Sequence, residues 1–239
     1  MTPRLYSLLP FLLLACGTTA AHAEATATAS LTSFSYQLID LDPADGIAPS
    51  LTLSGQNLIV SAAGFPDDSG DSDPSSTLLV PGTASVNMYY GSASSTFGTD
   101  GSFATATASN HEAMAVSISR WNFSLSAHTT VIFTAIGSAS ANYEGNMRAF
   151  GDAAIFAQYR ISPDVGYTTL QDDVFISSGN GGRPLSLSIS SSDTELAGIV
   201  GNAASAEAYS LTPVPEPESY AMLLAGVAVL ACCGRRRKA

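Results

Sequence analysis

Cysteine is missing from almost the entire chain of 239 residues. The only three, Cys16, Cys232 and Cys233, lie in apolar segments near the two ends. A disulfide scaffold and a cysteine-ligated zinc site are therefore excluded for the long stretch between them.

Basic residues are nearly as scarce in the interior. Between positions 24 and 212, four arginines and no lysine stand against 18 acidic residues, which gives this region a net charge of −14. A surface this acidic repels phosphate backbones and anionic lipid. We therefore expect no nucleic acid among the partners.

Residues that could carry catalysis are also few. The interior contains two histidines, His111 and His128, and its many serines include none in a G-x-S-x-G nucleophile elbow. The His111-Glu112 pair lacks the second histidine of a zinc-binding helix. We predict that the protein is not an enzyme, that it has no catalytic residues, and that both histidines lie at the surface or at strand ends.

The N-terminus has the three parts of a secretory signal peptide. A short, weakly positive segment precedes an apolar run over 5–15, and Ala21 and Ala23 then place small side chains at the −3 and −1 positions before Glu24. Signal peptidase requires small side chains at these two positions. We predict a signal helix within a peptide of residues 1–23, removed by cleavage after Ala23.

An alternative cleavage site lies earlier in the same peptide. Leu13-Leu14-Ala15-Cys16 resembles a lipoprotein box, in which the cysteine is acylated and becomes the first residue of the mature chain. The alternatives differ in outcome, because acylation at Cys16 would hold the protein on a membrane.

The C-terminus also has three parts. Pro215-Glu216-Pro217 holds the backbone extended, and a charge-free run of 16 residues, Ser219–Gly234, follows it. As a helix this run would be about 24 Å long against a hydrocarbon core of about 30 Å, so it spans a membrane marginally. Arg235, Arg236, Arg237 and Lys238 would then stop transfer and stay on the cytoplasmic side. Such a span suits a temporary tether.

These residues resemble the PEP-CTERM sorting signal of Gram-negative bacteria, in which a Pro-Glu-Pro motif, an apolar segment and an arginine cluster occur in this order. The resemblance covers 214–239 and implies recognition by exosortase, removal of the tail, and release or transfer of the remainder. It also implies an exported protein whose domain first lies in the periplasm, tethered transiently to the inner membrane, and then reaches the outer surface or the medium. The family is associated with exopolysaccharide and biofilm.

The segment between the two ends alternates apolar and polar residues with a period of two. Short alternating runs separated by Gly, Pro and Asp turns predict β-strands with one buried face. We therefore expect an all-β fold, an antiparallel β-sandwich that is jelly-roll-like, over residues 24–212, between the signal peptide (1–23) and the sorting tail (213–239). Inward positions rich in Ala, Thr and Val predict a thin core. The alternating runs are Phe34 to Leu38, Leu51 to Leu53, Val86 to Tyr90, Trp121 to Leu125 and Leu185 to Ile189.

One run breaks its own pattern. Between Ile118 and Trp121 the apolar phase shifts, which predicts a bulge or tight turn near Ser119-Arg120. Trp121, the lone tryptophan, alternates with polar neighbours and is therefore expected in the core.

Two aspartate-rich turns are candidates for a calcium site, since calcium prefers several carboxylate oxygens on a flexible loop. Neither turn has the spacing of an EF-hand, and solvated turns in an acidic protein are the simpler interpretation. No other cofactor is expected. The two sets are Asp40, Asp42 and Asp45, and Asp67, Asp68, Asp71 and Asp73.

Taken from sequence, the leading hypothesis is a non-catalytic exported protein, processed by signal peptidase and exosortase, with a structural or adhesive role in the envelope or matrix. A module that binds the exopolysaccharide is the first alternative, and an exposed row of aromatic side chains would favour it. A hydrolase is the second alternative, and it requires a histidine that faces both an acid and a hydroxyl.

Overall fold

The computed structural model describes residues 23–65, 75–89, 91–109, 111–161 and 166–211. These residues form twelve strands and no helix, and nothing among them is a helix capable of crossing a membrane. The predicted all-β fold is therefore confirmed for this part of the chain. The expected signal helix and the expected C-terminal hydrophobic helix lie outside the described residues.

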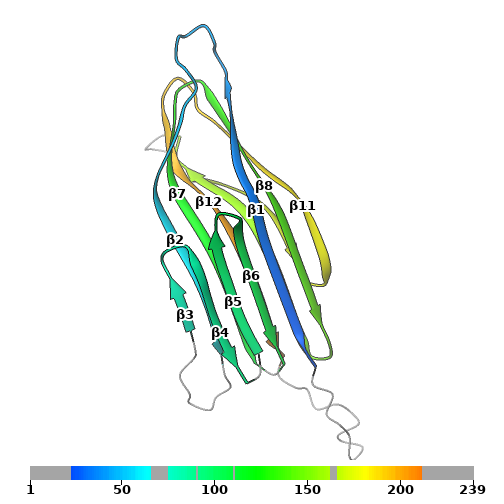
Figure 1. Cartoon of the computed structure of the whole chain (residues 1–239). Helices are drawn as coiled ribbons and strands as arrows, with labels where there is room; N and C mark the ends of the chain where they lie inside the picture. Colours follow the sequence, from blue (N-terminus) through cyan, green and yellow to red (C-terminus); the bar gives the residue numbers. More distant parts are fainter. Residues whose placement is uncertain (1–22, 66–74, 90, 110, 162–165, 212–239) are drawn as a thin grey trace, which may run out of the picture.

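The strands form two six-stranded sheets in which all neighbours are antiparallel (Figure 1). We call them sheet 1, with the strand order β11-β8-β1-β6-β5-β4, and sheet 2, with the order β10-β9-β12-β7-β2-β3. Sheet 1 contains β1 (Ala25–Asp40), β4 (Gly82–Met88), β5 (Gly91–Gly98), β6 (Gly101–Ala108), β8 (Thr129–Tyr143) and β11 (Gly179–Ser190). Sheet 2 contains β2 (Leu51–Phe65), β3 (Ser75–Leu78), β7 (Glu112–Leu125), β9 (Met147–Tyr159), β10 (Thr168–Ile176) and β12 (Leu196–Ser210).

The connectivity is nested around the first two strands. The outer pair, β1 with β8, belongs to sheet 1. The inner pair, β2 with β7, lies between them in sequence and belongs to sheet 2. Nesting of this kind is found in jelly rolls. The other strands depart from the simple nested order. In sheet 2, β12 lies between β9 and β7, and in sheet 1, β6 pairs with the second edge of β1.

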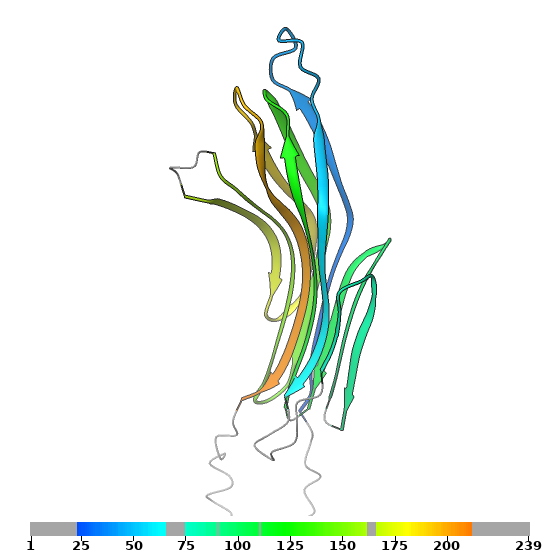
Figure 2. The ribbon, with the colours of Figure 1, turned by 90° about the vertical axis from the view of Figure 1, so that its left-hand side faces the viewer.

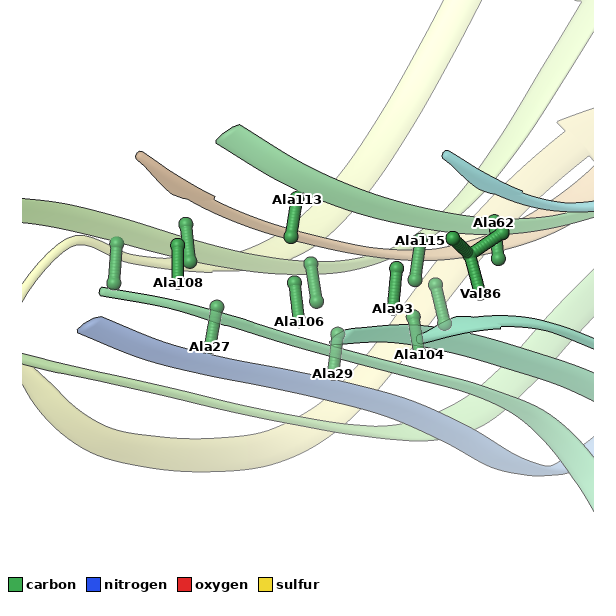
Figure 3. Close-up of a cluster of buried hydrophobic side chains, with 14 of the residues drawn as sticks. Ala27, Ala29, Ala62, Val86, Ala93, Ala104, Ala106, Ala108, Ala113 and Ala115 are labelled. Atoms are coloured by element: carbon green, nitrogen blue, oxygen red, sulfur yellow. The ribbon is translucent and has the colours of Figure 1, made fainter. Parts of the chain in front are cut away.

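The two sheets pack face to face around a core that differs between its two ends. One cluster of 20 buried residues contains 16 alanines, and Figure 3 shows several of them pointing into the space between the sheets. The second cluster has 16 buried residues, of which only four are alanine, and includes Phe123, Leu125, Phe133 and Ile155. Alanine side chains are short, so the sheets can approach closely at the alanine end. The predicted thin core is confirmed there.

Gly151 in β9 lies close to the backbone of the opposite sheet. A Cβ added to this glycine would lie 2.3 Å from the carbonyl oxygen of Thr28 in β1 and 3.0 Å from that of Ser140 in β8. Both atoms belong to the backbone of the opposite sheet and cannot rotate away. Any residue other than glycine at this position would therefore require the backbone to shift.

The predicted bulge near Ser119-Arg120 is wrong. β7 pairs with β12 without interruption, and the register shift is in the neighbouring strand β2, between Ser54 and Asn57, where Gly55 has a φ of 60°. A second shift occurs in β1 between Thr32 and Ser35, where Ser33 has a φ of 57°.

Because β7 is regular, every second residue continues to point inward, and some of these inward residues are polar. Ser117 and Ser119 are fully buried, while Val116 and Ile118 on the same strand lie on the outer face of sheet 2. Gln56 Nε2 donates a hydrogen bond to Ser119 Oγ at 3.1 Å, which offsets the cost of burying that hydroxyl. The apparent phase shift in the sequence thus reflects polar residues in the core.

Trp121 lies on the inward face of β7, as predicted. Its ring stacks on that of Phe34 in β1, with centroids 5.6 Å apart and planes 7° apart, and Phe34 in turn stacks on Phe133 at 5.8 Å. The three rings join the two sheets at the end of the core with the larger side chains.

Candidate functional site

Both ends of the domain meet at one turn, which connects β8 to β9. The N–H of Glu144 donates to the carbonyl oxygen of Glu24 at 3.2 Å, and the N–H of Leu211 donates to that of Asn146 at 2.8 Å. β1 therefore begins, and β12 ends, at the same end of the molecule (Figure 2).

Of the terminal residues predicted from sequence, Ala23 and Glu24 lie in the described part of the chain. Ala23 packs against the alanine cluster, and β1 begins at Ala25. The other terminal candidates, and the second aspartate set, lie outside the described residues. They are Cys16, Ala21, Asp67, Asp68, Asp71, Asp73, Pro215, Glu216, Pro217, Arg235, Arg236, Arg237 and Lys238.

The opposite end of the domain is formed by loops that converge on His128. The backbone of this residue has a φ of 49°, which is uncommon outside glycine. Its carbonyl oxygen accepts the N–H of Leu41, which follows β1, and its own N–H donates to the carbonyl oxygen of Ser192, which follows β11; both distances are 2.8 Å. Three loops, after β1, β7 and β11, are thus connected through one residue.

The His128 ring lies between two carboxylates from different loops. Nδ1 is 2.5 Å from Oδ2 of Asp45, and Nε2 is 3.0 Å from Oδ1 of Asp193. The side chain of Asp45 is 13% exposed and that of His128 is 28% exposed, whereas Asp193 is 94% exposed. The contact with Asp45 is therefore the better shielded from solvent.

These contacts shift the protonation of both partners. The hydrogen bond with Asp45, followed by the one with Asp193, raises the pKa of His128 above its ordinary value. The hydrogen bond with His128, followed by the one from the N–H of Ile47, lowers the pKa of Asp45. Both shifts favour a charged pair, an imidazolium between two carboxylates.

The loop that follows β1 is ordered by hydrogen bonds to its own aspartates. Oδ1 of Asp40 accepts the N–H of Asp42 at 3.0 Å, Oδ1 of Asp42 accepts that of Ala44 at 3.2 Å, and Oδ1 of Asp45 accepts that of Ile47 at 2.6 Å. Aspartates bonded to the backbone two residues ahead are common in tight turns. Each of the three predicted calcium ligands therefore already has one oxygen occupied by the loop.

A cation could be held here by one atom each from Asp42, Asp45 and His128, which lie within 4.8 Å of one another. Calcium prefers six to eight oxygen ligands, and an imidazole nitrogen is a ligand for softer metals. The charged pair at His128 also competes for the Asp45 carboxylate. Calcium binding by Asp40, Asp42 and Asp45 stays a prediction, to be checked by the melting temperature in millimolar calcium.

His128 lies directly before β8 and is partly exposed, which agrees with its predicted position at the surface or at a strand end, but its partners were not predicted. Asp45 and Asp193 are 83 and 65 residues away in the chain. No local pattern connects the three, since each belongs to a different loop. His111 lies just before β7.

A comparison with protein families bears on the tail. The family model of the PEP-CTERM protein-sorting motif matches residues 213–238. The chain carries a PEP-CTERM sorting motif. This confirms the resemblance seen in the sequence and identifies the protein as an exported one directed to exosortase through its C-terminus. Searches of curated proteins and of solved structures find no match to the chain.

Proposed function

We propose that this PEP-CTERM protein is a non-catalytic component of the cell envelope or extracellular matrix, with a structural or adhesive role after exosortase has removed its tail. The observation that carries the proposal is the position of the two ends. The sorting motif begins at residue 213, two residues after Leu211, whose N–H is bonded to the turn where β1 also begins. The tail thus leaves the end of the domain that is opposite the His128 loops.

This geometry suits a tethered intermediate. While the tail spans the inner membrane, the described end of β12 faces that membrane and the His128 loops point into the periplasm. In the sequence, Pro215-Glu216-Pro217 follows the last described strand and precedes the apolar run, so an enzyme in the membrane would reach it without unfolding the sheets. Removal of the tail then leaves every strand intact.

The chemistry of the His128 loops also favours a non-catalytic role. Both ring nitrogens of His128 contact carboxylates, so neither faces a serine hydroxyl, as general-base catalysis would require. The hydrolase alternative therefore has no support at His128.

One observation favours the carbohydrate-binding alternative. On the outer face of sheet 2, the ring of Phe150 contacts that of Phe175 at a centroid distance of 5.6 Å and that of Tyr209 at 5.8 Å, and Phe175 is 56% exposed. Exposed rings of this kind can stack on sugar rings. Trp121 does not contribute, because it stacks on Phe34 between the sheets.

The sorting half of the proposal is tested by Glu216→Ala, with Glu218→Ala as the matched control. Both variants remove one carboxylate from the same segment, but only Glu216 lies between Pro215 and Pro217. We expect the Glu216 variant to be exported normally and to accumulate in the membrane with its tail. The Glu218 variant should be processed like the wild type.

Immunoblots of membrane and medium fractions measure these outcomes. Deletion of the host exosortase should reproduce the Glu216→Ala result, whereas deletion of 235–238 should weaken the stop to transfer and release chains that still have their tails. The proposal is contradicted if both the Glu216 variant and the exosortase deletion release a tail-less protein at the wild-type level. The segment would then be an ordinary membrane anchor.

The structural or adhesive half is tested separately, by deleting the gene and measuring cell aggregation and matrix retention. We expect both to fall, and to be restored by the wild-type gene but not by the Glu216→Ala gene. Unchanged aggregation and retention would contradict a role in the matrix while leaving the sorting result intact.

A further inference from the structure

The outer face of sheet 2 carries an apolar hollow with two carboxylates in it. Cross-strand register places Glu207 of β12 between Phe150 of β9 and Met114 of β7. In the adjacent row, Asp152 of β9 lies opposite Phe175 of β10. All five side chains lie on the outer face, because their neighbours in sequence point into the core.

Together with Val116, these side chains line a pocket of about 310 Å³. Ligand pockets in proteins typically measure about 300–1,000 Å³, so this one suits a small molecule. Its walls are two phenylalanine rings, a methionine and a valine, and its polar lining consists of the carboxylates of Asp152 and Glu207 and the hydroxyl of Ser205. The ion pairs at His128 and Arg183 do not involve Asp152 or Glu207.

One carboxylate oxygen of Asp152 has no hydrogen-bond partner among the described residues. This oxygen, Oδ1, is inaccessible to solvent. Burial, and next the charge of Asp173, raise the pKa of Asp152. A ligand cannot reach this oxygen, but Asp152 as a whole is partly exposed, and a positive charge in the pocket would offset the cost of keeping its carboxylate ionised there.

We propose that this pocket binds an organic ammonium ion, whose N–H groups donate to Asp152 and whose carbon skeleton packs against Phe150 and Phe175. Three features select this class. The carboxylates repel anions, the apolar walls offer too few oxygens for a metal ion, and the aromatic and aliphatic side chains suit the carbon skeleton of an organic cation. Aromatic faces also attract ammonium groups.

The ammonium group could belong to an apolar amine or to an amino sugar, and two probes distinguish these sources. Calorimetric titration of the full-length protein in a nonionic detergent would use cyclohexylammonium and glucosamine. Cyclohexanol, which is uncharged, and N,N,N-trimethylcyclohexylammonium, which has no N–H, serve as controls. We expect saturable binding of at least one primary ammonium probe and no binding of either control.

Two variants locate the binding. Asp152→Asn keeps the size of the side chain and removes its charge, and we expect affinity to fall about tenfold, the loss expected for one charge-assisted hydrogen bond. Phe175→Ala removes an exposed ring and should also weaken binding. Asp100→Asn, which removes the same charge from a distant turn, should bind like the wild type.

Glucosamine binding would support an amino-sugar ligand and connect the pocket with the carbohydrate alternative. Cyclohexylammonium binding alone would support an apolar amine. The proposal is overturned if neither probe saturates at millimolar concentrations, or if Asp152→Asn and Phe175→Ala both bind with wild-type affinity. It does not depend on exosortase processing, so its failure would leave the sorting proposal unaffected.

Discussion

Ser102 in β6 and Asn202 in β12 form a hydrogen bond between the two sheets. The hydroxyl of Ser102 donates to Oδ1 of Asn202 at 3.1 Å, and the two residues are 0% and 4% exposed. In a core built largely from alanine, a directional contact of this kind fixes how the sheets align, which apolar packing alone specifies less sharply.

Replacing Asn202 with Ala should destabilise the domain by about 1–3 kcal/mol, because the hydroxyl of Ser102 would remain buried without a partner. Urea denaturation followed by circular dichroism measures the free energy of unfolding. Thr83→Val is the control, since Thr83 and Thr96 are joined by a hydroxyl contact of 2.9 Å at an exposed site. The control should change stability by less than about 0.5 kcal/mol. Equal effects of the two substitutions would show that the bond between the sheets has no special role.

His128→Asn should destabilise the domain more at mildly acidic than at alkaline pH. The pKa of His128 is raised in the folded state. Its contribution to the free energy of unfolding is therefore fully present below the unfolded pKa of about 6.5 and disappears as pH rises through the folded pKa. The pKa of Asp45 is lowered in the folded state, so its contribution to the free energy of unfolding is present above the unfolded pKa of about 3.8 and is lost as pH falls through the folded pKa. Asparagine tolerates the positive φ of this position.

The measurement is the difference in free energy of unfolding between wild type and variant, in EDTA, at about pH 5.5 and about pH 9. The difference should be larger at the lower pH. Asp193→Asn should have a smaller effect than Asp45→Asn, because the Asp193 side chain is 94% exposed and solvent screens its charge, whereas that of Asp45 is 13% exposed. A difference that does not vary with pH would contradict the charged pair.

Gly151→Ala should destabilise the domain by about 1–3 kcal/mol or more, because the added methyl would meet backbone carbonyls of the opposite sheet. Gly98→Ala is a matched control: an added Cβ there meets no atom within 4 Å, and the backbone is not in the left-handed region. The control should be neutral or slightly stabilising. Thermal unfolding of both variants, compared with wild type, decides whether close approach of the sheets is required.

Mass spectrometry of the protein from cells and medium should find Glu24 as the first residue. Cleavage after Ala23 leaves β1 whole, because β1 begins at Ala25 and the Glu24 carbonyl is still available to Glu144. Ala21→Leu should block this cleavage, since the −3 position requires a small side chain, whereas His22→Leu should not. An acylated Cys16 at the N-terminus would show that the lipoprotein alternative is correct.

The sequence by itself determined the C-terminal sorting motif and the all-β character of the domain. Sorting motifs are read as linear segments, so Pro215-Glu216-Pro217, the apolar run and the arginine cluster were recognisable without a fold. Period-two alternation is likewise local, because successive side chains in a strand point to opposite faces. It was sufficient to predict strands around Phe34, Leu51, Trp121 and Leu185, all of which occur.

Tertiary structure alone decided which face of a strand is buried and which distant residues meet. On β7, apolar side chains occur on both faces, so alternation could not tell that Ser117 and Ser119 point inward while Val116 points outward. The pairing of His128 with Asp45 joins loops that are 83 residues apart, and the strand order that brings them together follows from packing two whole sheets. Local patterns carry no information on such contacts, because these contacts exist only when all the strands have taken their places.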